Sequence, residues 1–350
     1  MCLAEISIIS RTQLYDTKTS IRLLDGHVQL TDVLVDNASS SCIEIAGSST
    51  STFDLDGSHL SNCAEAGILV TTDGLVDINN VTVISGSIGV KVVASEGHFK
   101  LRNSSIFDMT LSAVDVTYTD NPSTGNFTLE NSVVHNCSSG IQYRSDNSRS
   151  NVRVRVFNNS FSMIPANALA INLRLWEQCN TNDAGENNAD VALNTFDNVC
   201  DILLYNYGGR KVYVTFHDNT IKNCNCLKTE ECLLVAQYDF VSNIVCDVFT
   251  NVSGIVCDVS NNVFYNNTDQ CLTRLKSTPA DIAFDGTFFN NQLLENDVTD
   301  AGVIIESRYF TLSQNRFENP VSNIDVRANI NGNRCWFRYL YKFCTFTHTM

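Results

Sequence analysis

The stretch Val76–Val83, with the sequence VDINNVTV, contains the pattern that decides the fold. Two apolar residues stand at alternate positions, an Asn follows two positions later, and another apolar residue comes three positions after the Asn. Alternation sends the apolar side chains to one face of a β-strand and their neighbours to the other. Asn, Asp and Gly tolerate the left-handed backbone of a tight corner. Each copy of the pattern therefore predicts a strand with one buried face that ends at a corner.

The same pattern recurs about every 25 residues along most of the chain. Its copies begin at Val28, Phe53, Val76, Phe99, Phe127, Val154, Val191, Val214, Cys257, Ile282 and Phe310. A second strand follows the clearer copies, in Gly67–Val70, Gly89–Val93, Gly140–Tyr143 and Gly302–Ile305. A propeller blade needs a period of about 40 residues, and a leucine-rich repeat needs a regular leucine framework. The pattern instead predicts an all-β, right-handed parallel β-helix of the pectin-lyase-like kind, with about eleven coils.

The composition agrees with a chain of strands and turns. Its 350 residues include 40 Asn, 33 Ser and 29 Thr but only 4 Pro and 4 Met, which favours turns and strands over helices. The formal net charge is −15, so a nucleic acid or an anionic membrane surface would be repelled. We therefore expect no nucleic-acid partner.

Irregular steps in the repeat predict the domain limits. Residues 1–27 read as a poorly defined start, and the β-helix is expected over 28–329, with a projecting loop near 176–188. A step of 43 residues is expected to contain one degenerate coil near Cys232–Asp247. Residues 330–350 form an aromatic and basic tail that reads as a non-native or truncated end, and neither end has the pattern of a cap.

The Asn that follows the paired apolar residues has a predicted structural role. Stacked Asn side chains can hydrogen-bond from coil to coil inside a solenoid and so satisfy buried polar groups. The predicted inward ladder consists of Asn80, Asn103, Asn131, Asn158 and Asn261. Three of these also begin N-x-Ser/Thr sequons, but an inward residue cannot carry a glycan. The remaining sequons give the candidate glycosylation sites Asn37, Asn126, Asn136, Asn251 and Asn266.

Fourteen cysteines favour an oxidising, extracellular setting, although the first residues carry no signal peptide and no apolar run could span a membrane. Any membrane attachment is thus expected through a segment absent from this chain. Three cysteines, Cys63, Cys137 and Cys224, take the same place in their coils, which predicts buried, stacked residues. The predicted bridges are Cys200 with Cys224, on adjacent coils, and Cys226 with Cys232, around one loop.

No catalytic constellation emerges from the sequence. The chain has no Asp-Asp pair, no Gly-His-Gly and no Arg-Ile-Lys, the motifs that supply acid and base in polygalacturonase-like hydrolases. A lyase would need several acids to hold calcium and an arginine to take the proton, for which the candidates are Asp54, Asp56, Asp73 and Asp77 with Arg102. The six His lack metal-ligand spacing. We expect no catalytic, cofactor-binding or metal-binding residue.

The segments Gly302–Ser307, Asn315–Pro320 and Asn323–Arg327 resemble the β-helix blocks of the protein bark beetle family, and the resemblance extends from Val28 to about Asn329. Members of that family are very large animal membrane proteins that organise epithelial junctions. The resemblance implies a non-enzymatic, extracellular interaction module at cell junctions, with other cell-surface or junction proteins as partners. The alternative is a carbohydrate-active enzyme, either a polysaccharide lyase or a glycoside hydrolase.

Overall fold

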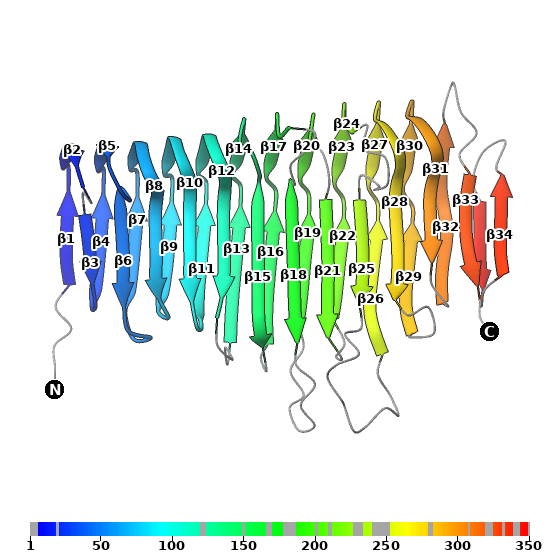
Figure 1. The fold of residues 1–350 in the computed structure, drawn as a ribbon, viewed down its shortest axis with the longest axis horizontal. Helices are drawn as coiled ribbons and strands as arrows, with labels where there is room; N and C mark the ends of the chain where they lie inside the picture. Colours follow the sequence, from blue (N-terminus) through cyan, green and yellow to red (C-terminus); the bar gives the residue numbers. More distant parts are fainter. Residues whose placement is uncertain are drawn as a thin grey trace.

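Each copy of the repeat folds as the first strand of a coil, and the coils stack into a rod with the two chain ends at opposite ends (Figure 1). The computed structural model describes residues 6–18, 21–119, 124–148, 151–165, 170–177, 187–199, 202–208, 212–226, 234–239, 253–278, 283–306, 309–318, 325–330, 333–338 and 344–348.

The first strands pair in parallel, residue by residue, and we call their ladder sheet 1. Its described members, in order, are the twelve strands β1 (Ile6–Ser10), β4 (His27–Thr31), β7 (Thr52–Asp56), β9 (Leu75–Asn79), β11 (Gly97–Arg102), β13 (Thr124–Glu130), β16 (Asn151–Phe157), β19 (Asn187–Ala192), β22 (Val212–His217), β26 (Ser253–Ser260), β29 (Ala283–Phe289) and β32 (Tyr309–Glu318). The predicted parallel β-helix is confirmed. The twelve strands of this ladder are slightly more than the eleven or so coils predicted.

A short second strand follows each first strand across a corner, and the stack of second strands is sheet 2. Sheet 2 contains β2 (Gln13–Thr17), β5 (Leu34–Ala38), the first parts of β8 (His59–Thr72), β10 (Thr82–Ala94) and β12 (Ser105–Tyr118), then β14 (Val133–His135), β17 (Ser160–Ser162), β20 (Thr195–Asp197), β23 (Thr220–Lys222), β27 (Val263–Tyr265), β30 (Gln292–Leu294) and the later part of β32.

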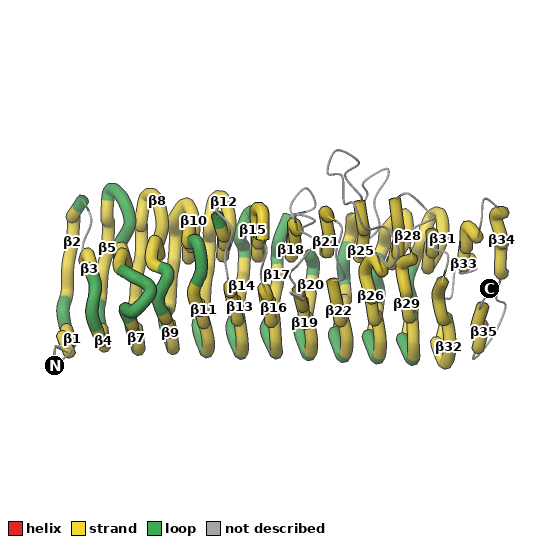
Figure 2. Tube along the Cα trace, turned by 90° about the horizontal axis from the view of Figure 1, so that it is seen from below, coloured by secondary structure: helices red, strands yellow, loops and turns green. Residues whose placement is uncertain are grey.

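A third strand completes each coil, on the side of the rod opposite sheet 1 (Figure 2). This sheet 3 contains β3 (Ile21–Leu24), β6 (Ile43–Gly47), the later parts of β8, β10 and β12, then β15 (Ile141–Ser148), β18 (Ile171–Glu177), β21 (Ile202–Gly208), β25 (Leu234–Asp239), β28 (Thr268–Thr278), β31 (Asp297–Glu306) and β33 (Asp325–Ile330). The second strands predicted at Gly67, Gly89, Gly140 and Gly302 all fall in or beside members of this sheet.

The core consists of inward columns that run the length of the rod. From β4 onward, one column of sheet 1 has no member more than 1% exposed: Leu30, Leu55, Ile78, Leu101, Leu129, Val156, Val191, Phe216, Val259, Phe288 and Leu312. Complete burial of one such side chain stabilises the fold by about 1.5–3 kcal/mol relative to exposure. Because every coil contributes to the same columns, the stack of coils shares one continuous core.

Two copies of the repeat were predicted in the wrong register. Val191, rather than Leu193, pairs with Val156 and Phe216, and Phe288 takes the place predicted for Phe284. In these coils Ala189 and Gly286 occupy the first inward position. Because a small residue takes the place of a larger apolar one there, the sequence pattern was matched a few residues away from its true position.

The predicted domain limits also need correction. Residues of β1 pair with β4, so a coil already lies within the segment predicted as a poorly defined start. The long step near Cys232–Asp247 contains no extra coil, because Phe216 pairs directly with Val259, and β25 belongs to that same coil. The projecting loop lies mostly outside the described residues, since β18 ends at Glu177 and β19 begins at Asn187.

Part of the predicted tail pairs with the last coils of the rod. The strand β34 (Asn333–Arg338) lies antiparallel to β33, and β35 (Cys344–His348) lies antiparallel to β32. All other described pairings of the rod are parallel. These two strands change the direction of pairing, which the sequence pattern did not predict.

The corner Asn residues point outward, which corrects the predicted inward ladder. Asn80, Asn103, Asn131, Asn158 and Asn261 all have φ between 51° and 56°, as expected for a corner, but all five are exposed. Two consecutive residues face outward at each corner because the left-handed residue interrupts the alternation of the strand. Coil-to-coil bonds do form between exposed amides, for example from Asn158 Nδ2 to Asn131 Oδ1 at 2.7 Å.

The buried ladder begins one residue later, immediately after the corner. It consists of Asn159, Asn194, Asn219, Asn262, Asn291 and Asn315, each at most 3% exposed. The backbone N–H and the Nδ2 of Asn194 both donate to Oδ1 of Asn219, at 2.9 and 3.0 Å. Its Nδ2 also donates to the carbonyl of Val156, at 2.9 Å. The same arrangement repeats in the following coils, so the buried amides are satisfied without water.

Candidate functional site

The outer face of sheet 1 contains a shallow hollow that spans β9, β11, β13, β16 and β19, with a volume of about 430 Å³. Its polar lining comes from outward positions of the strands, among them His98, Lys100, Asn126, Arg153 and Arg155. Successive first strands are in register, so these side chains stand in straight columns about 4.8 Å apart. Ligand sites are concave and combine apolar surface with a few convergent polar groups, which makes this hollow the candidate binding site.

The hollow carries more basic than acidic side chains, Lys100, Arg153 and Arg155 against Asp190, although the whole chain is acidic. Lys100 Nζ lies 3.0 Å from a carboxylate oxygen of Glu130, which largely neutralises that pair. The Arg155 guanidinium stacks over the Phe157 ring at 4.4 Å, a geometry that favours an exposed cation. Arg153 and Arg155 are both exposed, and neither has a carboxylate partner among the described residues. The hollow therefore offers two arginines to an anionic ligand.

Three of the four acids proposed for a lyase site are hydrogen-bonded to neighbouring coils. Both oxygens of Asp77 accept hydrogen bonds from Arg102, from Nε and Nη2, each at 3.0 Å. Asp56 accepts a hydrogen bond from Asn79 at 2.7 Å. Asp73 lies in the turn before β9, where its Oδ1 accepts backbone N–H groups of the next coil. The structure thus brings Asp54, Asp56, Asp77 and Arg102 together on sheet 1, but Asp73 stabilises a turn instead.

A histidine held between two carboxylates lies beside the hollow. His217 contacts Asp218 through Nδ1 at 2.6 Å and Asp190 through Nε2 at 3.1 Å, and Thr215 donates to Asp190 at 2.9 Å. Burial by itself would lower the pKa of His217, but the bond to Asp218 and the charges of both carboxylates outweigh it and raise that pKa above its usual value. Sequence reasoning missed this cluster because its members come from two neighbouring coils.

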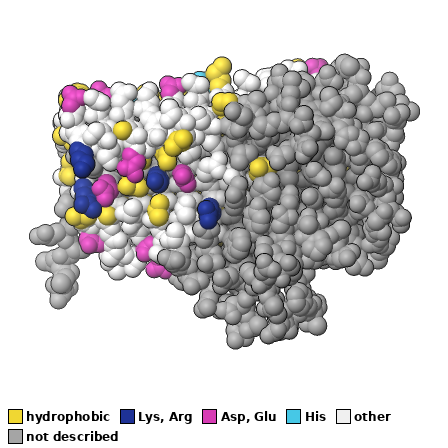
Figure 3. Space-filling model, in the orientation of Figure 1, with side chains coloured by type: hydrophobic (Ala, Val, Ile, Leu, Met, Phe, Trp, Pro, Cys, Tyr) yellow, Lys and Arg dark blue, Asp and Glu magenta, His cyan; other side chains and the backbone are white. Residues whose placement is uncertain are grey.

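The outer face of sheet 3 has a different charge pattern. Figure 3 shows acidic and basic side chains next to one another over the described coils of this face. Two of its ion pairs are Arg22 with Glu44 at 3.2 Å and Lys91 with Glu65 at 4.0 Å. Over the described coils of this face, charges that pair in this way leave no patch of one sign. The basic hollow of sheet 1 is therefore the better candidate for a charged ligand.

No described group of three or more His, Cys, Asp or Glu residues is arranged to hold a metal ion. Among the same residues, no helix has the length and hydrophobicity to cross a membrane.

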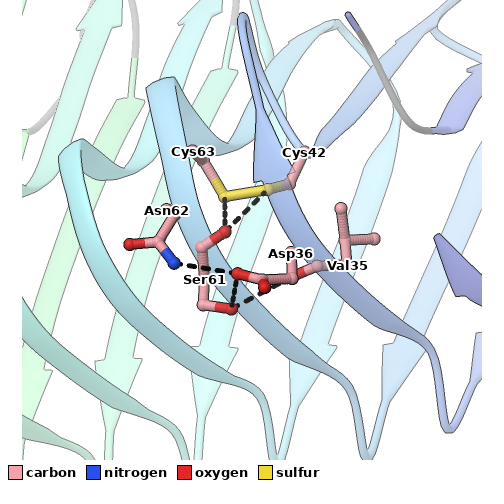
Figure 4. Close-up of a disulfide and its surroundings, with 6 residues drawn as sticks. All are labelled: Val35, Asp36, Cys42, Ser61, Asn62 and Cys63. Carbon is pink, nitrogen blue, oxygen red and sulfur yellow. Dashed lines mark hydrogen bonds between the residues drawn. A yellow bond between two sulfur atoms is a disulfide. The ribbon is translucent and has the colours of Figure 1, made fainter. Parts of the chain in front are cut away.

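A disulfide that the sequence reading did not pair joins the second and third coils (Figure 4). Cys42 and Cys63 are bonded, with their Cα atoms 5.5 Å apart and a separation of 21 positions in the chain. Beside the bridge, Asp36 accepts hydrogen bonds from Ser61 and Asn62, each at 2.8 Å, and these bonds lower the pKa of Asp36. The separation of roughly one coil is the signal that could have found this pair. Disulfides persist in oxidising compartments.

The other cysteine predictions have mixed outcomes. Cys63, Cys137 and Cys224 are all buried, as their shared place in the coils predicted. Cys224 is a thiol that donates to the carbonyl of Lys222, so the predicted bridge with Cys200 is wrong. Cys200 and Cys232 lie outside the described residues, and a bridge between Cys226 and Cys232 stays a prediction. Burial raises the pKa of Cys137 to about 11, so this thiol is not a nucleophile at neutral pH.

The sequons fall on different surfaces. Asn37, Asn136 and Asn266 are exposed corner residues with left-handed φ, and Asn251 lies outside the described residues. Asn126 is half-buried in the hollow, where its Nδ2 lies 2.6 Å from Nδ1 of His98, so a glycan there would occupy the candidate site. The three ladder predictions that begin sequons, Asn80, Asn103 and Asn158, are exposed and are acceptor candidates after all.

Comparison with known proteins gives one result that bears on identity. A family model described as "Right handed beta helix region" matches residues 20–196, which is half of the chain. A comparison with curated proteins found no significant match, and neither did a comparison with solved structures. The matched residues include the coils from β4 to β19, which contain the hollow and the disulfide. The parallel ladders and the family model agree, and the chain belongs to the right-handed β-helix family.

Proposed function

We propose that this chain is a rigid, non-catalytic extracellular interaction module that contributes to cell adhesion. The observation that carries the proposal is the state of the carboxylates on the outer face of sheet 1. Asp77 is held by Arg102, Asp56 by Asn79 and Asp190 by His217, so these acids stabilise the stack. General acid–base cleavage needs carboxyl groups aimed at the substrate. Among the described charged residues that line the hollow, Arg153 and Arg155 have no carboxylate partner, which suits binding of an anionic ligand.

Three further features support this proposal. The continuous core and the Asn ladder favour a stiff rod, because each coil is bonded to the next along several columns. The Cys42–Cys63 disulfide favours a secreted or cell-surface location. The resemblance of several segments to the blocks of the bark beetle family favours epithelial junctions and partners among junction proteins.

A carbohydrate-active enzyme is the second candidate, and the hollow itself favours it. A basic groove suits an acidic polysaccharide, and the His217–Asp190 pair at its edge contains a base and an acid. In a lyase or hydrolase of this design, Asp190 or His217 would move the proton.

Incubation of the purified chain with a panel of acidic and neutral polysaccharides separates the two candidates. The interaction module is expected to release no new reducing or unsaturated ends at any pH. Cleavage by the wild-type chain that Asp190→Asn abolishes would establish the enzyme instead. Thr287→Ala is the control outside the hollow. It removes the hydrogen bond from Thr287 to Asp258, which is equivalent to the bond from Thr215 to Asp190.

A further inference from the structure

The outer face of sheet 1 carries opposite charges on two strands that lie four coils apart, β7 and β16. On β7, Asp54 and Asp56 are exposed, and no described residue forms an ion pair with either. Partial burial, followed by the charge of Asp77, raises the pKa of Asp54 and outweighs the opposite effect of the Arg102 and His27 charges. On β16, Arg153 and Arg155 are the unpaired bases. The face therefore contains an acidic patch and a basic patch that cannot reach each other within one chain.

We propose that this face binds a second copy of the chain, with two rods packed face to face and antiparallel, so that the acidic patch of each meets the basic patch of the other. The inference rests on the proposed function and names its partner. A two-fold axis that lies in the interface and runs parallel to the strands reverses the order of the coils. A strand on one side of the axis then faces, in the second copy, the strand that lies equally far on the other side of the axis.

The register of sheet 1 gives the position of that axis. The order of the strands is β7, β9, β11, β13, β16, so an axis along β11 exchanges β7 with β16. Each lies two coils from the axis, or about 10 Å. Asp54 and Arg155 both stand at the middle outward position of their strands, so each Asp54 faces Arg155 of the second copy. At the axis, Lys100 meets its own copy, but Glu130 already neutralises it.

The available area fits a reversible dimer. The strands from β4 to β19 form a face of about 30 Å by 16 Å, from the spacing of coils and the rise per residue. Both copies together would bury roughly 1,000 Å² or slightly more, at the lower limit of specific interfaces. Micromolar rather than nanomolar association is therefore expected.

Charge reversal on the complete 350-residue chain, produced without N-linked glycans, tests this inference by sedimentation at about 0.15 M salt, where the Debye length is about 8 Å. The wild-type chain is expected to dimerise. The double variants Asp54→Lys with Asp56→Lys, and Arg153→Glu with Arg155→Glu, should each raise the dissociation constant about tenfold or more. An equimolar mixture of the two variants should dimerise again. In the mixed dimer, the lysines introduced on one variant face the glutamates introduced on the other, and the two unchanged patches also face each other.

The mixture also separates a lost interface from a lost fold, since misfolded variants would not recover. Arg22→Glu, which reverses an exposed charge on sheet 3, is the control that should leave the dissociation constant unchanged. A monomeric wild-type chain, or variants that dimerise as the wild type does, would overturn the inference, and so would a mixture that stays monomeric. None of these results bears on polysaccharide cleavage or on location at cell borders. The proposed function is tested by those two measurements, so its failure can be told apart from the failure of this inference.

Discussion

Substitution of Asn159 by Ala is expected to destabilise the rod far more than a change at its neighbour Asn158. The Asn159 side chain accepts the backbone N–H of Ser132 at 2.9 Å and donates to the carbonyl of Leu129 at 3.0 Å. Alanine would leave both backbone groups buried and unsatisfied, and each costs about 1–3 kcal/mol. The expected loss in the free energy of unfolding is therefore about 2–6 kcal/mol.

Asn158→Gly is the matched control, because glycine accepts the left-handed backbone at this exposed corner, where φ is 55°. It removes one exposed hydrogen bond to Asn131, so the expected loss is below about 1 kcal/mol. Urea unfolding followed by circular dichroism measures both variants, and unequal slopes would reveal partial unfolding of the solenoid. Equal losses, or a larger loss for Asn158→Gly, would refute the placement of the buried ladder one residue after the corner.

Two further predictions concern the disulfide and His217. Replacement of both Cys42 and Cys63 by Ala should lower the stability of the first coils by about 3 kcal/mol, because the unfolded chain is then no longer constrained by a closed loop. Hydrogen exchange of the backbone amides in β3 to β8 measures this loss, and exchange rates equal to those of the wild type would contradict it. The pKa of His217 is raised in the folded protein, so the protonated ring stabilises the fold. This contribution to the free energy of unfolding is complete below pH 6.5, the usual pKa of histidine, and is lost as the pH rises through the folded-state pKa. The stability difference between wild type and His217→Gln should accordingly be larger at about pH 6 than at about pH 9. A difference that does not change with pH would show that the carboxylates do not hold the charged ring.

The sequence predicted the fold well because the evidence for it repeats in every coil. Alternating apolar residues, a left-handed Asn and a fixed period identify a strand and a corner even when one copy is weak. The errors arose where a coil departs from that pattern. Ala189 and Gly286 replace an apolar residue and shifted the register, and the long coil before Val259 was taken for two.

The site was harder to predict because it depends on which residues neighbouring coils bring together. The ladder was misplaced by one position, since alternation was assumed to continue through a residue that the left-handed corner turns outward. Arg153, Arg155 and Asp190 share the hollow only because β16 and β19 pair across a long loop. The charge pattern of the face becomes visible only once the outward columns are aligned.

The location of the endogenous protein tests the central claim, adhesion at cell borders, most directly. Antibody raised against residues 28–329 can be applied to an epithelium of the source organism. The proposed function predicts signal at cell borders and vertices. Signal confined to a gut lumen or to secretory granules, with none at junctions, would contradict it and favour the polysaccharide-cleaving alternative.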